Sequence, residues 1–370
     1  MRYEKMQITK FLVRIKPLPS ESLSSWRQRS AWENGYRLFP ILDERRRRVD
    51  PDRTVSSQDE QWLSEAHEID SASIAQLALS GPIGKPLTTN NPVLHPPWWI
   101  RARYPSNARQ YGGMFCPKCL NEDQKPYFRL HWRFGFITSC EVHKVRLLDA
   151  CPKCQCAPWP RGSGFRDLMS DSFTDFRKCW HCGIDNSGLD TQTISIENPW
   201  NKWFQEDAAT FGLINVPVSE ALSALRAICQ LFLRNRSRMA ILKSENFWSS
   251  IAFALSSEAI QSNSIEQCRV GDREILVSTA MQILSDWPTS FRTFAQKCSI
   301  SRFHFSGSYE ALPKWLLEEV DTTLAKHNRN VTPEIIAKTI QDMKSELGRR
   351  PFKGEVRRRL NWEGAMPEFI

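Results

Sequence analysis

The stretch that decides the fold runs from residue 116 to residue 154 and reads CPKCLNEDQKPYFRLHWRFGFITSCEVHKVRLLDACPKC. It contains three pairs of Cys or His side chains in which two residues separate the members, and a fourth such pair follows at residues 179 and 182. This spacing lets one tight turn direct two side chains at a single ion, and two turns complete a tetrahedral zinc site. The pattern therefore predicts two bound zinc ions.

Sequential pairing of the turns assigns eight ligands to two sites. The first site has Cys116, Cys119, Cys140 and His143, and the second has Cys151, Cys154, Cys179 and Cys182. The spacing also permits an interleaved pairing. Cys156 and His181 lie in the same region without this spacing, so we treat them as non-ligands.

A structural rather than a catalytic role is predicted for both zinc ions. Four protein ligands leave no open position for water, which a catalytic zinc requires. The chain also contains no His-x-Glu, the partner motif of the zinc nucleobase deaminases. The sequence therefore favours a protein that is not an enzyme, with a zinc-dependent enzyme as the least favoured alternative.

Aromatic and basic residues alternate between the first two turns. The aliphatic and aromatic members are Tyr127, Phe128, Leu130, Trp132, Phe134, Phe136 and Ile137, and the basic ones are Arg129, His131 and Arg133. In one interpretation the rings stack on nucleic acid while Arg129 and Arg133 contact its backbone. In the other, which we favour, the rings pack against the zinc turns and the arginines face solvent. His131 is predicted to be a structural histidine.

Composition places the chain among ordinary globular proteins. It has 370 residues, 41% hydrophobic and 25% charged, which predicts two to four domains. We find no apolar run long enough to span a membrane and no signal peptide, so a cytoplasmic protein is expected. Eleven cysteines in a reducing compartment favour metal over disulfides. Zinc-bound thiolates would lower the formal charge from +9 to about +6, which allows nucleic-acid contact without requiring it.

Helical patterns dominate both sides of the cysteine-rich block. Ser20 or Ser22 is predicted to cap a helix that ends at Asn34-Gly35, and residues 58–80 are predicted to form one or two amphipathic helices. Further helical patterns cover residues 198–212, 219–239 and 271–298, with a break at Pro288. The expected fold is mainly α with small zinc-ribbon or zinc-knuckle modules. The expected domains are residues 1–105, 106–195, 196–310 and 311–370.

The C-terminal segment resembles part of a helix-turn-helix. Thr332 and Pro333 predict a helix start and Gly348 its end, and residues 356–360 resemble a second helix, with only ten residues left for a third. Residues 344–359 carry a net charge of +5. Either a solvated basic tail or a surface that contacts nucleic-acid backbone fits this charge. The candidate contacts there are Arg349, Arg350, Lys353, Arg357, Arg358 and Arg359.

Two segments resemble the TniQ/TnsD family of transposon target-selection proteins. Residues 116–154 are similar to its core motif of CPxCL, an acidic pair, PYxRLxW, CxxH and CPxC, and PLPSESLSSWRQRSAWENGY at residues 17–36 resembles its N-terminal signature. The resemblance covers about the first 180 residues and is weak beyond them. It implies a non-enzymatic adaptor that recruits the AAA+ ATPase TnsC to an insertion site.

The family resemblance leaves the mode of target selection open. Shorter TniQ proteins dock, often as dimers, on an RNA-guided effector such as Cascade with its guide RNA and target DNA. TnsD-like proteins instead bind an attachment sequence directly, through longer C-terminal regions with helix-turn-helix units. The short chain and incomplete helix-turn-helix favour effector docking, and a TniQ protein of a mercury-type transposon fits the same residues. A homodimer is possible in this reading, and no membrane partner is expected.

Overall fold

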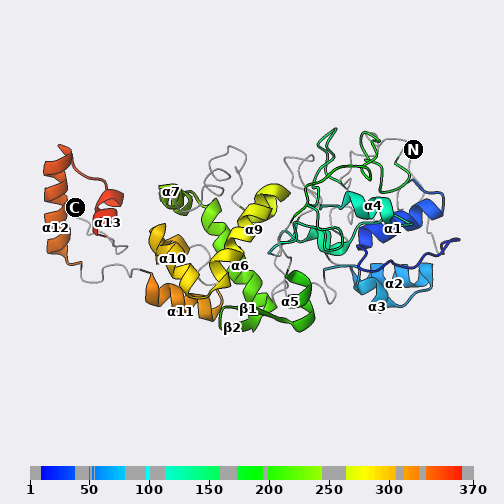
Figure 1. Ribbon diagram of the computed structural model, residues 1–370, viewed down its shortest axis with the longest axis horizontal. Coiled ribbons are helices and arrows are strands. Elements are labelled where there is room, and N and C mark those ends of the chain that lie inside the picture. The colour runs from blue at the N-terminus through cyan, green and yellow to red at the C-terminus, as the bar shows by residue number, and fades with distance from the viewer. Residues whose placement is uncertain are drawn as a thin grey trace.

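The computed structural model describes residues 10–37, 50, 52–53, 55–79, 97–100, 113–158, 173–194, 199–243, 264–305, 312–324 and 331–360. Over these residues the protein is mainly helical, as the sequence predicts, and it has one two-stranded antiparallel sheet. The N-terminal helices and the C-terminal helix pair lie at opposite ends of the molecule (Figure 1). No described helix has both the length and the apolar character needed to cross a bilayer.

Three short helices form the N-terminal unit, and each begins at a side-chain cap. The helices are α1 (Leu23–Glu33), α2 (Ser57–His67) and α3 (Ser71–Ala75), capped by Ser22, Ser56 and Asp70. The caps accept hydrogen bonds from backbone amides that the first helical turn leaves without partners. Phe11, Leu23, Trp26 and Leu63 belong to the core of this unit. Both helical predictions for this region are confirmed.

The cysteine-rich region contains little regular structure. Its described helices are α4 (Pro117–Glu122) and the 3-10 turn η3 (Leu130–Arg133). Isolated β-bridges pair Phe115 with Leu148 and Ser139 with Arg146. The chain is therefore held by turns and by its buried aromatic side chains.

The next region is built on two long helices, α6 (Val218–Leu233) and α9 (Val270–Ser285). Around them lie α5 (Trp200–Glu206), α7 (Asn235–Lys243), η5 (Ile265–Gln267), α10 (Thr289–Lys297), η6 (Arg302–Phe305) and α11 (Lys314–Thr323). The predicted break at Pro288 separates α9 from α10.

The helical prediction for residues 198–212 is wrong in its second half. Helix α5 ends where Asp207 takes a left-handed conformation, and a hairpin of β1 (Ala208–Phe211) and β2 (Ile214–Pro217) follows. Gly212 turns this hairpin with φ +54°, and a Cβ there would lie 2.7 Å from the carbonyl oxygen of Trp287. Only glycine fits this turn without displacing the backbone of a distant segment.

One hydrophobic core joins the cysteine-rich region to the helical region. Its buried members run from Leu79 to Leu324 and therefore extend across the boundary predicted near residue 195. Trp98 is central because its indole N–H donates to the carbonyl of Leu222 at 2.9 Å, and its backbone N–H donates to Glu266 at 2.8 Å. The cysteine-rich region, which carries the predicted metal ligands, therefore packs directly against the helical region.

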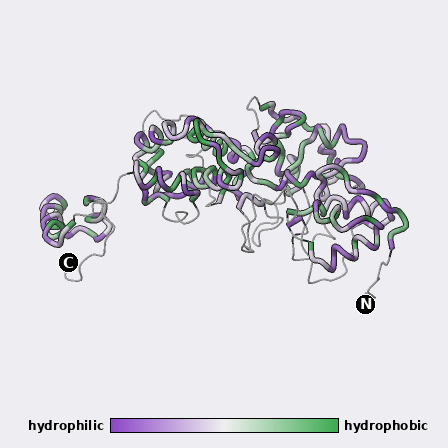
Figure 2. Tube along the Cα trace, turned by 90° about the horizontal axis from the view of Figure 1, so that it is seen from below, coloured by the Kyte–Doolittle hydropathy of each residue, from purple (hydrophilic) through white to green (hydrophobic). Residues whose placement is uncertain are grey.

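The C-terminal pair consists of α12 (Pro333–Leu347) and α13 (Lys353–Leu360). Thr332 caps α12, and Gly348 ends it with a left-handed φ of 64°, as predicted. Ile336, Met343 and Val356 form the small core between the helices. Figure 2 shows mostly hydrophilic residues in this pair. The third helix of a helix-turn-helix would fall on residues 361–370, outside the described residues.

Candidate metal centres

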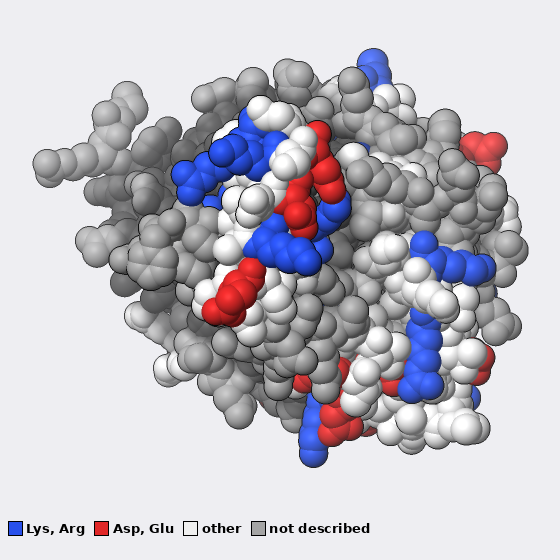
Figure 3. Space-filling model, turned by 90° about the vertical axis from the view of Figure 1, so that its left-hand side faces the viewer, with Lys and Arg blue, Asp and Glu red and all other residues white. Residues whose placement is uncertain are grey.

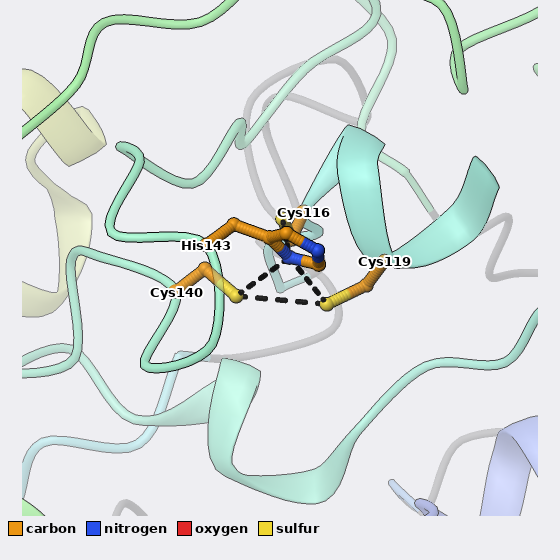
Figure 4. A group of neighbouring side chains, drawn as sticks. All are labelled: Cys116, Cys119, Cys140 and His143. Carbon is orange, nitrogen blue, oxygen red and sulfur yellow. Dashed lines mark hydrogen bonds between the residues drawn. The ribbon is translucent and has the colours of Figure 1, made fainter. Parts of the chain in front are cut away.

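The first predicted ligand set comes together in one cluster. The Nδ1 atom of His143 lies 3.3 Å from Sγ of Cys119 and 3.5 Å from Sγ of both Cys116 and Cys140 (Figure 4). Cys116 immediately precedes α4, and Pro117 starts that helix, so its first turn directs Cys116 and Cys119 to the same point. The second pair sits in a turn closed by the Lys144 N–H on the carbonyl of Cys140 at 2.9 Å.

Hydrogen bonds among the thiols of this first cluster shift their pKa values in opposite directions. Hydrogen bonds with Cys116 and Cys119 hold the pKa of Cys140 well below its ordinary value, whereas hydrogen bonds with Cys116 and Cys140 raise the pKa of Cys119. A metal ion needs these ligands as thiolates, so binding would release the protons that they share.

Glu122 holds His143 from the side away from the sulfur atoms. Its Oε2 lies 2.8 Å from Nε2 of His143, which leaves Nδ1 facing the three cysteines. Burial acts to lower the pKa of His143, but the hydrogen bonds with Glu122 and Cys140 raise it overall. A carboxylate in this position fixes the ring and its tautomer for a metal. The sequence analysis missed Glu122, although its place three residues after Cys119 on α4 puts it on the same helical face.

The second predicted ligand set also comes together. Cys151 and Cys182 lie 3.6 Å apart at Sγ, as do Cys154 and Cys179. Cys151 and Cys154 lie in one turn and Cys179 and Cys182 in a matching one, because the Gln155 amide donates to the Cys151 carbonyl and the Gly183 amide to the Cys179 carbonyl. In each of the two sets, the four ligand atoms lie within 4.8 Å of one another. The side chains thus adopt the sequential pairing rather than the interleaved one.

Both clusters have the donors of a closed zinc site. Four thiolate or imidazole donors from paired turns match structural zinc in number and type. A cluster with all four positions filled by protein can stabilise the fold but has no position for a substrate or for water. Cys156 and His181, treated as non-ligands, lie beside the second cluster and form a further donor group with Cys154.

The aromatic residues between the turns belong to the protein interior. Leu130, Trp132, Phe134 and Phe136 are buried, and Phe134 stacks on Phe136 with ring centroids 5.6 Å apart. This packing agrees with the favoured interpretation for the rings. Their faces are therefore used by the core rather than by nucleic-acid bases.

The surroundings of Arg133 and Arg129 differ from both interpretations, in which the arginines contact nucleic acid or face solvent. Arg133 is only 5% exposed, and its guanidinium bonds Asp52 at 2.6 Å and Asp50 at 2.5 Å. Arg129 is mostly buried and forms a bidentate pair with Asp123, both bonds being 3.1 Å long. Neither arginine faces solvent, and both guanidinium groups are paired with carboxylates, so their contact with nucleic acid stays a prediction that this pairing does not favour. The partners of Arg133 are more than 80 residues away, and no local pattern indicated them.

The two segments that carry the family resemblance contact each other. The amide of Ser22 donates to the carbonyl of Phe128 at 2.9 Å, and the amide of Leu130 donates to that of Ser20 at 2.8 Å. Next to this junction the buried Glu21 accepts two 2.7 Å hydrogen bonds from Arg29. The N-terminal signature therefore forms one structural unit with the segment between the metal turns.

The C-terminal cations alternate with acidic residues. Arg349 forms a bidentate pair with Glu355 at 3.0 and 2.8 Å, and Arg359 bonds Glu346 at 2.9 Å. Figure 3 faces this end of the molecule and shows basic and acidic side chains side by side. Arg350 and Lys353 are exposed. The side chains of Arg357 and Arg358 lie outside the described part of the chain.

The fold and the clusters define a class: a mainly helical protein with two clusters of four Cys or His side chains, each of which could hold a metal ion. A family model described as TniQ matches residues 12–147, so this part of the chain is similar to the TniQ family. The match includes the first cluster and the segments that contact each other, whereas the second cluster lies beyond it. A search of curated proteins found no match. The TniQ match implies a role in the selection of transposition targets.

Proposed function

We propose that this protein is an adaptor that links a target-recognition complex to the AAA+ ATPase TnsC during transposition. In this proposal the recognition complex is an RNA-guided effector of the Cascade type, with its guide RNA and target DNA. The TniQ match over residues 12–147 is the observation that carries the proposal. The adaptor works in the cytoplasm and holds two structural zinc ions, one in the first cluster and one in the second.

The form of the metal clusters supports a binding role. Each places four protein donors within 4.8 Å of one another, which fills a tetrahedral zinc site. Zinc in such a site would stabilise a region that has few regular elements of its own. The result is a rigid surface for protein contacts.

Charge on the C-terminal pair supports effector docking over direct DNA reading. Direct readers bind DNA largely through Lys and Arg side chains that neutralise phosphates. Here Arg349 and Arg359 already pair with Glu355 and Glu346. The positive charge that these two arginines could offer to a duplex is correspondingly reduced.

Direct DNA binding is the second candidate, and the exposed Arg350 and Lys353 favour it. Each phosphate contact adds about 0.9 to the slope of log affinity against log salt. If both residues contact phosphates, replacing both with alanine should lower that slope by about 2. An unchanged slope would remove this pair from any DNA interface.

Co-elution with purified TnsC tests the adaptor proposal. The full-length zinc-loaded protein is mixed with TnsC and ATP and passed over a size-exclusion column. We expect a joint peak that persists after nuclease treatment. Separate elution at micromolar concentrations, together with salt-resistant binding to one genomic duplex, would instead identify a direct DNA reader.

A further inference from the structure

The second metal cluster has more donors beside it than one ion can use. Cys154 belongs to two donor groups, the four-cysteine set and a second group with Cys156 and His181. The ligand atoms of this second group also lie within 4.8 Å of one another. The two groups together contain more donors than one tetrahedral site can use, and the sulfur of Cys154 belongs to both groups.

His181 carries an unusual unpaired atom. Its Nδ1 is buried and has no hydrogen-bond partner, although a buried ring nitrogen normally finds one. The ring packs edge-on against Trp180 with centroids 5.5 Å apart, and the indole of Trp180 is anchored on the carbonyl of Ala157 at 2.7 Å. A cation bound through Nδ1 would supply the partner that this nitrogen lacks.

The local charge favours a second cation at this place. Four thiolates around one zinc ion leave a net charge of −2, which attracts another cation. A thiolate can bridge two ions, and thiolate with imidazole is a donor set that zinc-type cations prefer. The first cluster lacks an equivalent of Cys156. Cys156 lies two residues after Cys154, whereas Asn121 lies two residues after Cys119.

We propose that Cys154, Cys156 and His181 form a third metal site, in which the Cys154 thiolate bridges to the ion of the four-cysteine set. The site takes a soft divalent cation of the zinc type. Binding releases the proton of the Cys156 thiol to solvent. Three protein donors leave its fourth position open to water or to an external ligand, unlike the two closed clusters.

Cadmium provides the test, because two cadmium ions that share a sulfur show scalar coupling in 113Cd NMR. The full-length protein is loaded with excess 113Cd and measured without removing the excess metal. We expect three protein-bound resonances, two of them coupled to each other. Two uncoupled resonances, or a third resonance without coupling, would overturn the proposal.

Single-residue variants test whether His181 and Cys156 are ligands of the third metal site. H181A and C156A should each lose one resonance and the coupling while they keep the other two. C268A removes a cysteine buried elsewhere and should leave all three resonances unchanged. Because His181 is only half-buried, H181A keeps the test valid if C156A does not fold. Three resonances with coupling in H181A would overturn the assignment.

Discussion

The guanidinium of Arg133 lies 2.6 Å from the carboxylate of Asp52, and both side chains are buried. This ion pair joins the segment between the metal turns to the segment that precedes α2. Asp52 also accepts from the amide of Ser24 at 2.6 Å, so the same carboxylate bonds the first turn of α1. Arg133 thereby fixes the N-terminal helices against the metal region.

Replacing Arg133 with alanine should destabilise the fold strongly. The change leaves the carboxylate of Asp52 buried without its cation, a loss of about 3–5 kcal/mol in the free energy of unfolding. Denaturant unfolding of the zinc-loaded protein measures it. R302A, which removes a partly exposed pair with Asp321, is the control and should lose less than about 1 kcal/mol. Similar losses in both variants would contradict the role given to Arg133.

Each metal cluster should depend on its own cysteines. C119S should remove one ion from the first cluster and C154S should empty the second, with a loss of solubility in both cases, because the local fold relies on the metal. Metal content by mass spectrometry and protein solubility provide the measurements. C229S, at a buried cysteine of α6, should retain the full metal content. A soluble C119S protein with unchanged metal content would refute the ligand assignment.

Glu122 should tune the affinity of the first cluster without binding the metal itself. E122Q weakens the hydrogen bond that orients His143, and the loss of such a partner lowers metal affinity by about 10- to 100-fold. Competition with a chromophoric zinc chelator measures this change. E141Q, next to Cys140 and exposed, is the matched control and should bind zinc as the wild type does. Equal affinities of E122Q and E141Q would argue against the positioning role.

His67 should make the N-terminal unit sensitive to acid. Burial lowers its pKa to about 4, and Arg14 adds to the effect, so the unfolded state takes up the proton first. The stability from neutral His67 is complete above about pH 6.5 and is lost as the pH falls toward 4. Wild type should therefore lose about 2 kcal/mol relative to H67F between pH 7.5 and 5. Unfolding of both proteins at both pH values measures this difference, and a pH-independent difference would contradict it.

Local patterns predicted the parts of the structure that depend on neighbours in sequence. Ser22 and Thr332 cap their helices through contacts three residues away, and the two-residue spacing of Cys116 and Cys119 is fixed by one helical turn. The grouping of eight ligands followed from pairing successive turns. These features need no knowledge of distant residues.

The features that the sequence did not reveal depend on distant contacts. The strands at residues 208–217 are only four residues each, and Gly212 turns them against Trp287 from another part of the chain. Arg133 is an ordinary basic residue in the sequence until Asp50 and Asp52 approach it. His181 lacks the ligand spacing, so only the fold places it beside Cys156.

Co-purification from the native host tests the adaptor account most directly. The tagged protein is isolated with its bound complexes, the proteins are identified, and any RNA is sequenced. The account predicts TnsC together with effector subunits and a guide RNA. Isolation without RNA or effector subunits, combined with salt-resistant binding to one genomic duplex, would contradict it.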